Sequence, residues 1–285
     1  MKTYLDCIPC FMKQALRVGK ISTDDEKQVK KILDKAGQLI HDIPMACSPP
    51  EIAKIIYDEI KSLTGVTDPY KTIKHENIKK ARALLPRMRE IIESSDNPLF
   101  EGARMAIAGN VIDFGIYETV NIEREILYSV ERDLTINDFD LFVKKLAQAR
   151  NIFYIGDNSA EAVFDRLFIE QINKPVTFVV RGEPILNDIT RAEAEIVGLN
   201  TVADIMSSGT SAPGNVINDC APEFLNKLAD ADLVISKGQG NYEALSDTSY
   251  PIFFMLKAKC HVIARDIGVP EGSLLLMARQ DQQTI

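Results

Sequence analysis

An abrupt change from apolar to polar residues after the run Ile152 to Ile155 is the feature that most constrains this chain. The run of β-forming residues ends at Gly156, Asp157 and Asn158 follow at once, and an apolar helical pattern then begins. Open α/β sheets place their ligands at such strand–turn–helix junctions. Side-chain oxygens without an adjacent thiol or imidazole suit Mg²⁺, Mn²⁺ or a similar ion. The junction therefore predicts a metal site at a sheet edge.

Strand and helix patterns alternate from about Asn137 onward. We expect strands at residues 152–155, 176–180, 201–205, 233–236, 252–256 and 274–278, and helices at residues 139–149, 159–172, 190–197, 222–229 and 262–267. Such alternation predicts an α/β fold with a doubly wound, mostly parallel sheet. Right-handed crossovers then place the C-terminal end of every strand at one edge.

The N-terminal part of the chain reads as one helix after another. We divide the chain into a helical subdomain, residues 1–108, and an α/β core, residues 109–285. Thr23 with Glu26 fits a capping box, and Ser48 before two prolines begins another helix. Pro86 is expected to break or kink its helix.

Polar segments follow four of the expected strands and should converge on one crevice, at residues 157–158, 181–188, 207–210 and 237–241. Asp157, Asn158 and Asp188 form an all-oxygen ligand set. Lys237, with the backbone and amide groups at Gly238 and Asn241, suits phosphate oxygens. Taken singly, each acidic or amide side chain could instead cap the helix that follows it. Several such side chains at one edge of the predicted sheet favour a ligand-binding site over helix caps.

Composition limits the class of partner. With 33 Lys and Arg against 41 Asp and Glu, the net charge is −8, which argues against nucleic acid and anionic membranes as partners. A phosphorylated substrate would then need a local positive site. Five cysteines do not make a disulfide scaffold, and the chain has neither an apolar run of about 20 residues nor a signal-peptide core at its start. We expect a cytoplasmic protein, and the sequence leaves open whether it forms a homo-oligomer.

Two further motifs have open interpretations. Cys7 and Cys10 lie at the start of the first helix, where the pair could bind metal, form a disulfide or pack as small buried side chains. The segment 109–115 sets a polar pair between two glycines, which suits either a close backbone approach or a helix C-cap with an Asx turn.

The chain resembles the damage-control phosphatases, the family catalogued as domain of unknown function 89. Segments 156–161, 187–190 and 237–243 carry the resemblance, and segments 109–115 and 7–10 also fit, the last looking like the stand-alone microbial branch with a Cys-x-x-Cys motif. The resemblance implies a three-layer α/β/α core and hydrolysis of phosphate esters of small metabolites, such as sugar phosphates or damaged phosphometabolites. It also implies a divalent metal, often Mn²⁺, Co²⁺ or Ni²⁺, with Mg²⁺ equally suited to oxygen ligands.

Matched by position, the resemblance assigns Asp157, Asn158 and Asp188 to the metal, and Asn110 and Lys237 to the phosphoryl group. The metal would polarise the phosphoryl oxygens and offset the charge that develops during displacement. The attacking group is either a water on the metal or the Asp157 carboxylate. We expect Asp113 to serve as a general acid or base.

Two other functions compete with this interpretation. Relatives of the family have also been assigned an S-adenosylmethionine-dependent carboxyl methyltransferase activity. The single glycine of the segment 156–158 fits that cofactor poorly. A non-catalytic metal- or metabolite-binding protein is the other alternative, which chelator-sensitive turnover of a phosphate ester would exclude.

Overall fold

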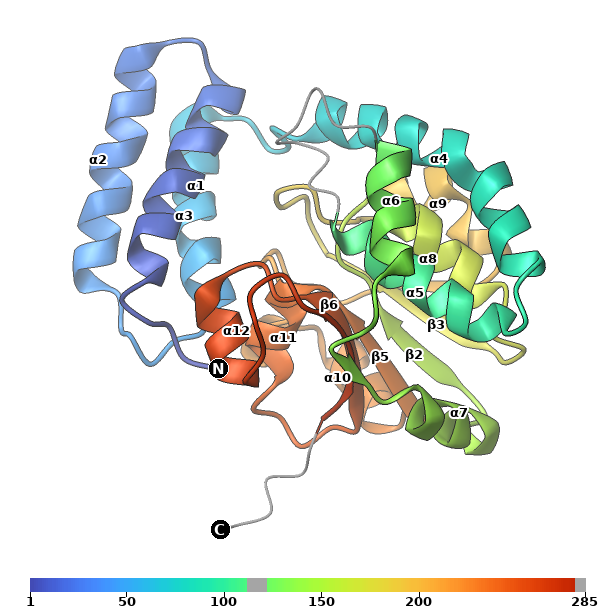
Figure 1. Cartoon of the computed structure of the whole chain (residues 1–285). Coiled ribbons are helices and arrows are strands. Elements are labelled where there is room, and N and C mark those ends of the chain that lie inside the picture. The colour runs from blue at the N-terminus through green and yellow to red at the C-terminus, as the bar shows by residue number, and fades with distance from the viewer. Residues whose placement is uncertain (112–121, 280–285) are drawn as a thin grey trace.

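The computed structural model describes residues 1–111 and 122–279, and its centre is a single seven-stranded sheet (Figure 1). The strands lie in the order β1-β7-β6-β5-β2-β3-β4. Their bounds are Ile136–Asn137 (β1), Ile152–Ile155 (β2), Val176–Val180 (β3), Asp204–Ser207 (β4), Leu233–Lys237 (β5), Ile252–Lys257 (β6) and Leu274–Ala278 (β7). The predicted α/β class is confirmed.

The direction of the chain across the sheet reverses at β2. From β2 the chain moves outward through β3 to β4, and it then returns to the other side of β2 to form β5 and β6. Pairing is parallel from β4 to β6. The carboxyl ends of β2 and β5 therefore flank the switch point, which is where such sheets bind ligands.

β1 and β7 run antiparallel to the other five strands. The expectation that every strand ends at one edge is therefore wrong. β7 pairs with β6 in the antiparallel sense, and β1 runs parallel to β7. Helix α12, His261–Ile267, connects β6 to β7, and β7 begins at the edge where β6 ends.

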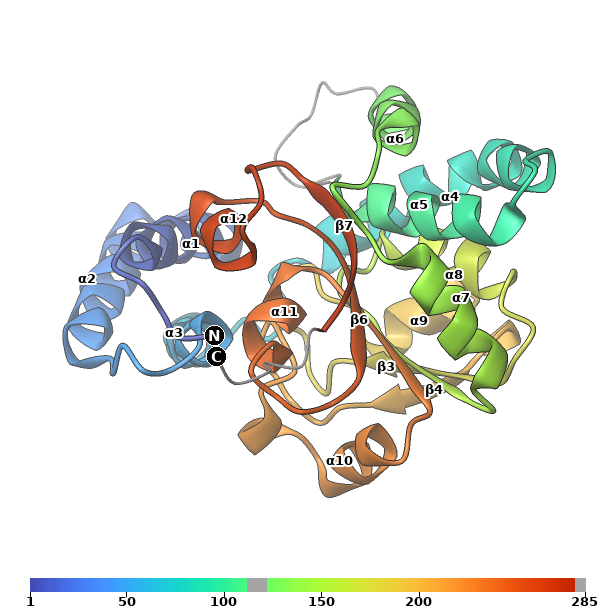
Figure 2. The same ribbon diagram turned by 60° about the horizontal axis from the view of Figure 1, so that its bottom comes forward.

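Twelve α-helices occur in the described part of the chain. Their bounds are Cys7–Ser22 (α1), Glu26–Asp42 (α2), Pro49–Thr64 (α3), Lys71–Glu93 (α4), Pro98–Val111 (α5), Ile122–Glu131 (α6), Phe139–Gln148 (α7), Ala162–Ile169 (α8), Arg191–Val197 (α9), Pro222–Ala229 (α10), Gln239–Leu245 (α11) and His261–Ile267 (α12). One apolar cluster joins α4–α9 to one face of the sheet, and a second joins α10–α12 to the other (Figure 2). The three-layer α/β/α arrangement is therefore confirmed.

Helices α1–α3 form a separate bundle with its own apolar cluster, seen to one side of the sheet in Figure 1. α3 begins with a capping box between Ser48 and Glu51 and ends at Gly65, whose φ of 70° is in the left-handed region. α4 and α5 pack in the same cluster as the sheet. By packing, the chain thus divides after α3, which differs from the predicted division at residue 108.

Several local expectations differ from the structure. The N-cap of α2 is Asp25, whose carboxylate accepts from the Lys27 backbone N–H, so the predicted box of Thr23 with Glu26 is wrong. α4 continues through Pro86, because Met88 and Ile92 beyond it are buried against the core. The third strand of the C-terminal half begins at Asp204, because residues 199–201 form a 3₁₀ helix.

Candidate functional site

The loops that follow β2 and β3 are bonded to each other, and this pairing brings the three predicted metal ligands together. The backbone of Asn158 pairs with that of Asp188 in an antiparallel bridge. The Ile189 N–H donates to the Asp157 carbonyl at 2.9 Å, and the Ser159 hydroxyl donates to the Asp188 carbonyl at 3.0 Å. The positions of both carboxylates are therefore fixed by backbone contacts between neighbouring strand ends.

The Asp157 carboxylate is held on one side by two amides and a glycine. Its Oδ2 accepts from the side-chain amides of Asn110 at 3.1 Å and Asn158 at 2.9 Å. Gly238 packs directly against the same oxygen: a Cβ there would lie 1.9 Å from it, and the φ of Gly238 is +80°. Because Gly238 has no side chain, it leaves room for the carboxylate. Its N–H donates to the Met255 carbonyl. Phosphate binding by Gly238 stays a prediction.

Arg181, to which the sequence analysis gave no role, is the cation nearest to the two carboxylates. It is 1% exposed, and its Nε donates to Asp188 Oδ2 at 2.8 Å. Its Nη2 lies 3.8 Å from Asp157 Oδ1 and donates to the Asn241 side-chain carbonyl at 3.2 Å. Asn241 in turn donates to the carbonyls of Gly156 and Lys237. Asn241 thus joins β5 to β2 and to Arg181 inside the protein.

Burial disfavours the ionised forms of both carboxylates. Desolvation, together with the charges of Asp188 and Glu161, raises the pKa of Asp157 to about 8. Desolvation also raises the pKa of Asp188, although the Arg181 guanidinium opposes the shift. A nearby cation would favour the charged form of each group.

Lys237 is placed in a buried network behind the site. Its ammonium donates to Glu161, to Asp165 Oδ1 at 2.6 Å and to the Ala106 carbonyl at 2.9 Å. Lys237 is 0% exposed and does not line the cavity described below. Because three protein acceptors already bind its protons, a direct contact between Lys237 and a phosphoryl group stays a prediction that would require one acceptor to be released.

Glu161 connects this network to the predicted metal ligands. It accepts from Asn110 Nδ2 at 2.7 Å and from Asn158 Nδ2 at 3.0 Å. The same two amides bind Asp157, so Glu161 orients the groups that orient the carboxylate. The predicted acid or base Asp113 lies outside the described residues.

The buried charges of the site suit a divalent cation. Four carboxylates and two cationic side chains, all at most 7% exposed, leave a net charge of −2 when ionised: Asp157, Glu161, Asp165 and Asp188 against Arg181 and Lys237. One oxygen each of Asp157, Asn158 and Asp188 accepts no hydrogen bond from a described residue, and Arg181 Nη2 lies 3.8 Å from that oxygen of Asp157. Hard oxygen donors of this kind fit Mg²⁺ or Mn²⁺. Within residues 1–111 and 122–279, no metal cluster of three or more His, Cys, Asp or Glu occurs.

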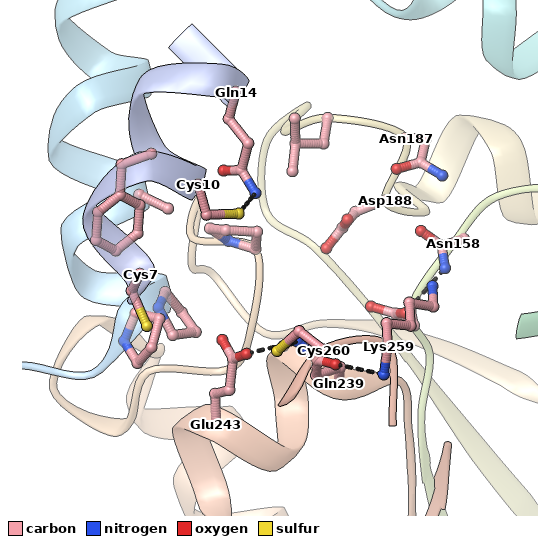
Figure 3. A pocket seen from close by; sticks show the side chains of 18 of the residues that line it. Cys7, Cys10, Gln14, Asn158, Asn187, Asp188, Gln239, Glu243, Lys259 and Cys260 are labelled. Carbon is pink, nitrogen blue, oxygen red and sulfur yellow. Dashed lines mark hydrogen bonds between the residues drawn. The ribbon is translucent and has the colours of Figure 1, made fainter. Parts of the chain in front are cut away.

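A cavity of about 320 Å³ opens between this edge of the sheet and the helical bundle. Asp157, Asn158 and Asp188 line one side, and residues of α1 and α3, including Cys10 and Tyr57, line the other. Figure 3 shows Asn158 and Asp188 across the cavity from Cys7 and Cys10 (Figure 3). The three predicted ligands therefore share one cavity, as the sequence analysis required.

Lys259, which the sequence analysis overlooked, also lines the cavity. It lies in the loop after β6, is exposed, and its charge lowers the pKa of Asp157. In the described part of the chain its ammonium has no hydrogen-bond or ion-pair partner. The signal was available, because β6 is a parallel strand and its polar successor falls at the same edge as the others.

Comparisons with known proteins identify the family. A family model described as the damage-control phosphatase ARMT1-like domain matches residues 3–275. The chain belongs to the damage-control phosphatase family. A damage-control phosphatase of Archaeoglobus fulgidus is 33% identical over 94% of this chain and 96% of its own length. One of Pyrococcus horikoshii is 33% identical over 97% and 98%, respectively.

The fold of the family is shared throughout. The crystal structure of a protein of the domain-of-unknown-function-89 family from Pyrococcus horikoshii matches with a TM-score of 0.90 and 30% sequence identity. The match covers 98% of this chain and 100% of that structure. The helical bundle and the sheet are therefore both part of the family fold. The described residues contain no helix with the length and apolarity needed to cross a membrane.

Proposed function

We propose that this member of the damage-control phosphatase family is a divalent-metal-dependent phosphatase that hydrolyses phosphate esters of small metabolites. One observation carries the proposal: Asp157, Asn158 and Asp188 line one cavity, and each keeps one oxygen that accepts no hydrogen bond from a described residue. Such a site retains a divalent ion of the Mn²⁺, Co²⁺, Ni²⁺ or Mg²⁺ type through hard oxygen ligands. When bound, the ion supplies charge stabilisation at the phosphoryl group.

The chain's own residues divide the remaining work. Lys259, whose ammonium has no partner among the described residues, binds a phosphoryl oxygen at the same end of the cavity. Arg181 fixes one oxygen of Asp188 so that the other faces the cavity. Asn110 does the same for Asp157 by donating to its Oδ2. These fixed groups need no reorganisation as charge develops, which is the basis of electrostatic catalysis.

The substrate is a small molecule rather than a macromolecule. A cavity of about 320 Å³ is at the lower end of the range for small-molecule sites, and the net charge of −8 disfavours nucleic acid and membrane surfaces. We place the enzyme in the cytoplasm.

The test is a panel of phosphorylated metabolites, with p-nitrophenyl phosphate as a generic ester, assayed with Mn²⁺, Co²⁺, Ni²⁺ and Mg²⁺ after treatment with a chelator. We expect turnover that returns only when metal is added. Activity that persists in excess chelator would overturn the metal requirement, and absence of turnover for every ester with every ion would overturn the phosphatase itself. Calorimetry with S-adenosylmethionine should show no binding.

A further inference from the structure

Glu243 is a carboxylate in the active-site cavity that neither the metal site nor the phosphate contact uses. It projects from α11 and lines the cavity together with Cys7, Cys10 and Cys260. Figure 3 shows Glu243 beside Cys260, on the side of the cavity away from Asn158 and Asp188. The cavity therefore has a second polar end.

The group that orients Glu243 is neutral. Gln239 Nε2 donates to Glu243 Oε1 at 2.9 Å, and the Gln239 carbonyl is fixed in turn by the Lys259 backbone N–H at 3.0 Å. The second carboxylate oxygen accepts no hydrogen bond from the described residues. The carboxylate is thus held in place and keeps one free oxygen.

Cationic side chains do not neutralise Glu243. Among the described residues no Lys, Arg or His forms an ion pair with it. The amino group of Met1 lowers the pKa of Glu243 by its charge, but it donates to the Glu243 backbone carbonyl and pairs with Asp247 at 3.1 Å. Burial raises the pKa of Glu243 to about 7. The neighbouring thiol of Cys7 is neutral, because partial burial raises its pKa.

The two ends of the cavity therefore have opposite preferences. Lys259 and the proposed metal attract a phosphoryl group at one end. At the other end Glu243, which has no ion pair with a cationic side chain of the described residues, attracts a cation in its ionised form. We infer that the preferred substrates are phosphate esters carrying an ammonium group, which pairs with Glu243. This inference rests on the phosphatase function proposed above.

Paired ligands that differ only in the cationic group test this inference. We would measure kcat/KM for ω-aminoalkyl phosphates of two to six carbons and for the matching ω-hydroxyalkyl phosphates, and for glucosamine 6-phosphate against glucose 6-phosphate. Calorimetry with the corresponding non-hydrolysable phosphonates supplies a binding readout that does not depend on turnover.

A hydrogen bond to a charged group typically contributes about 1.5–3 kcal/mol, which corresponds to a factor of about 10 to 100. We expect the amine to be preferred by about tenfold or more for at least one pair. In Glu243→Gln, which keeps the shape and the contact with Gln239 but removes the charge, that ratio should fall to about one. Glu243→Asp should keep part of the preference. Glu223→Gln, an exposed matched change at the start of α10, should leave the ratio as it is in the wild type.

An equal response to amine and hydroxyl ligands in every pair, or an amine preference that survives in Glu243→Gln, would overturn the inference. Failure of the phosphatase proposal looks different, because no ester would then be hydrolysed. In that case the phosphonate calorimetry still decides whether Glu243 binds an ammonium group. Thermal melting of each variant checks that it is folded.

Discussion

The two walls of the cavity differ in how firmly their side chains are held. On the sheet edge, Asp157 and Asp188 are 7% and 4% exposed, and each has at least one charged or amide partner. On the helical wall, Cys10 is exposed, and among the described residues its sulfur accepts one hydrogen bond, from the Gln14 amide at 3.6 Å. Under the function proposed above, the sheet edge would hold the reacting groups, and the helical wall would enclose the substrate.

The networks behind the walls differ in the same way. Behind the sheet edge lie the buried ion pairs of Lys237 with Glu161 and Asp165. In the bundle, Lys35 and Glu59 form a surface pair at 3.9 Å. Because a buried charge without a partner is costly while a surface pair contributes little, the stability of the molecule should respond very differently to the two sites.

The largest effect should follow from removing a metal ligand at the sheet edge. In Asp188→Ala we expect metal-dependent turnover to fall by about a thousandfold or more, since the ion loses a ligand and Arg181 loses its carboxylate partner. Steady-state kinetics with saturating Mn²⁺ measures the change. Asp204→Ala, an exposed position at the start of β4, is the matched control and should be unaffected. Comparable activity in Asp188→Ala would remove the sheet edge from the chemistry.

Breaking the buried network should be the next largest effect. Lys237→Met leaves Glu161 and Asp165 without their cation, and we expect the free energy of unfolding to fall by about 3–5 kcal/mol. Urea denaturation measures it. Lys35→Met should cost less than about 1 kcal/mol, because its pair is at the surface. Equal losses in the two variants would contradict the contrast drawn between the walls.

A smaller effect is expected when Arg181 is replaced by another cationic residue that lacks the planar guanidinium. Arg181→Lys retains a cation but cannot donate to Asp188 and Asn241 together through one planar fork. We expect Mn²⁺ affinity to fall by about 10- to 100-fold, as is typical when a group that orients a metal ligand is changed. Calorimetric titration provides the value. An unchanged affinity would mean that Arg181 does not orient the ligand.

The smallest effect should be on the helical wall. Tyr57→Phe removes a hydrogen bond from the phenol to Gln14 Oε1 at 3.0 Å, which should cost about 1 kcal/mol of folding stability. Metal affinity should be the same as in the wild type. A loss of Mn²⁺ binding in this variant would show that the bundle, too, holds the reacting groups.

How far the sequence predicts this molecule depends on how local each signal is. The strands Ile152–Ile155 and Val176–Val180 were predicted with correct bounds, because short apolar runs between chain breaks are local signals. The meeting of Asp157 with Asp188 followed from topology, since parallel neighbours end at one edge. Helix α11 was not predicted, because the glycine-rich segment at its start reads as a loop.

The partners of the buried charges could not be predicted in the same way. Lys237 reaches Ala106 and Glu161, which are 131 and 76 residues away in the chain, and no local pattern encodes such contacts. The antiparallel direction of β7 is a matter of its pairing with β6 in the folded sheet, and no pattern in the strand's own residues encodes it. The role of Arg181 likewise depends on tertiary packing, which brings its guanidinium to Asp188 and Asn241.

Calorimetric titration of the chelator-treated protein with Mn²⁺ is the most direct measurement of the central claim, which is that the sheet edge alone holds the metal. We expect one ion per chain in the wild type, no binding in Asp157→Ala, and unchanged binding in the double variant Cys7→Ser with Cys10→Ser. Binding that survives in Asp157→Ala, or that is lost in the cysteine variant, would contradict the account.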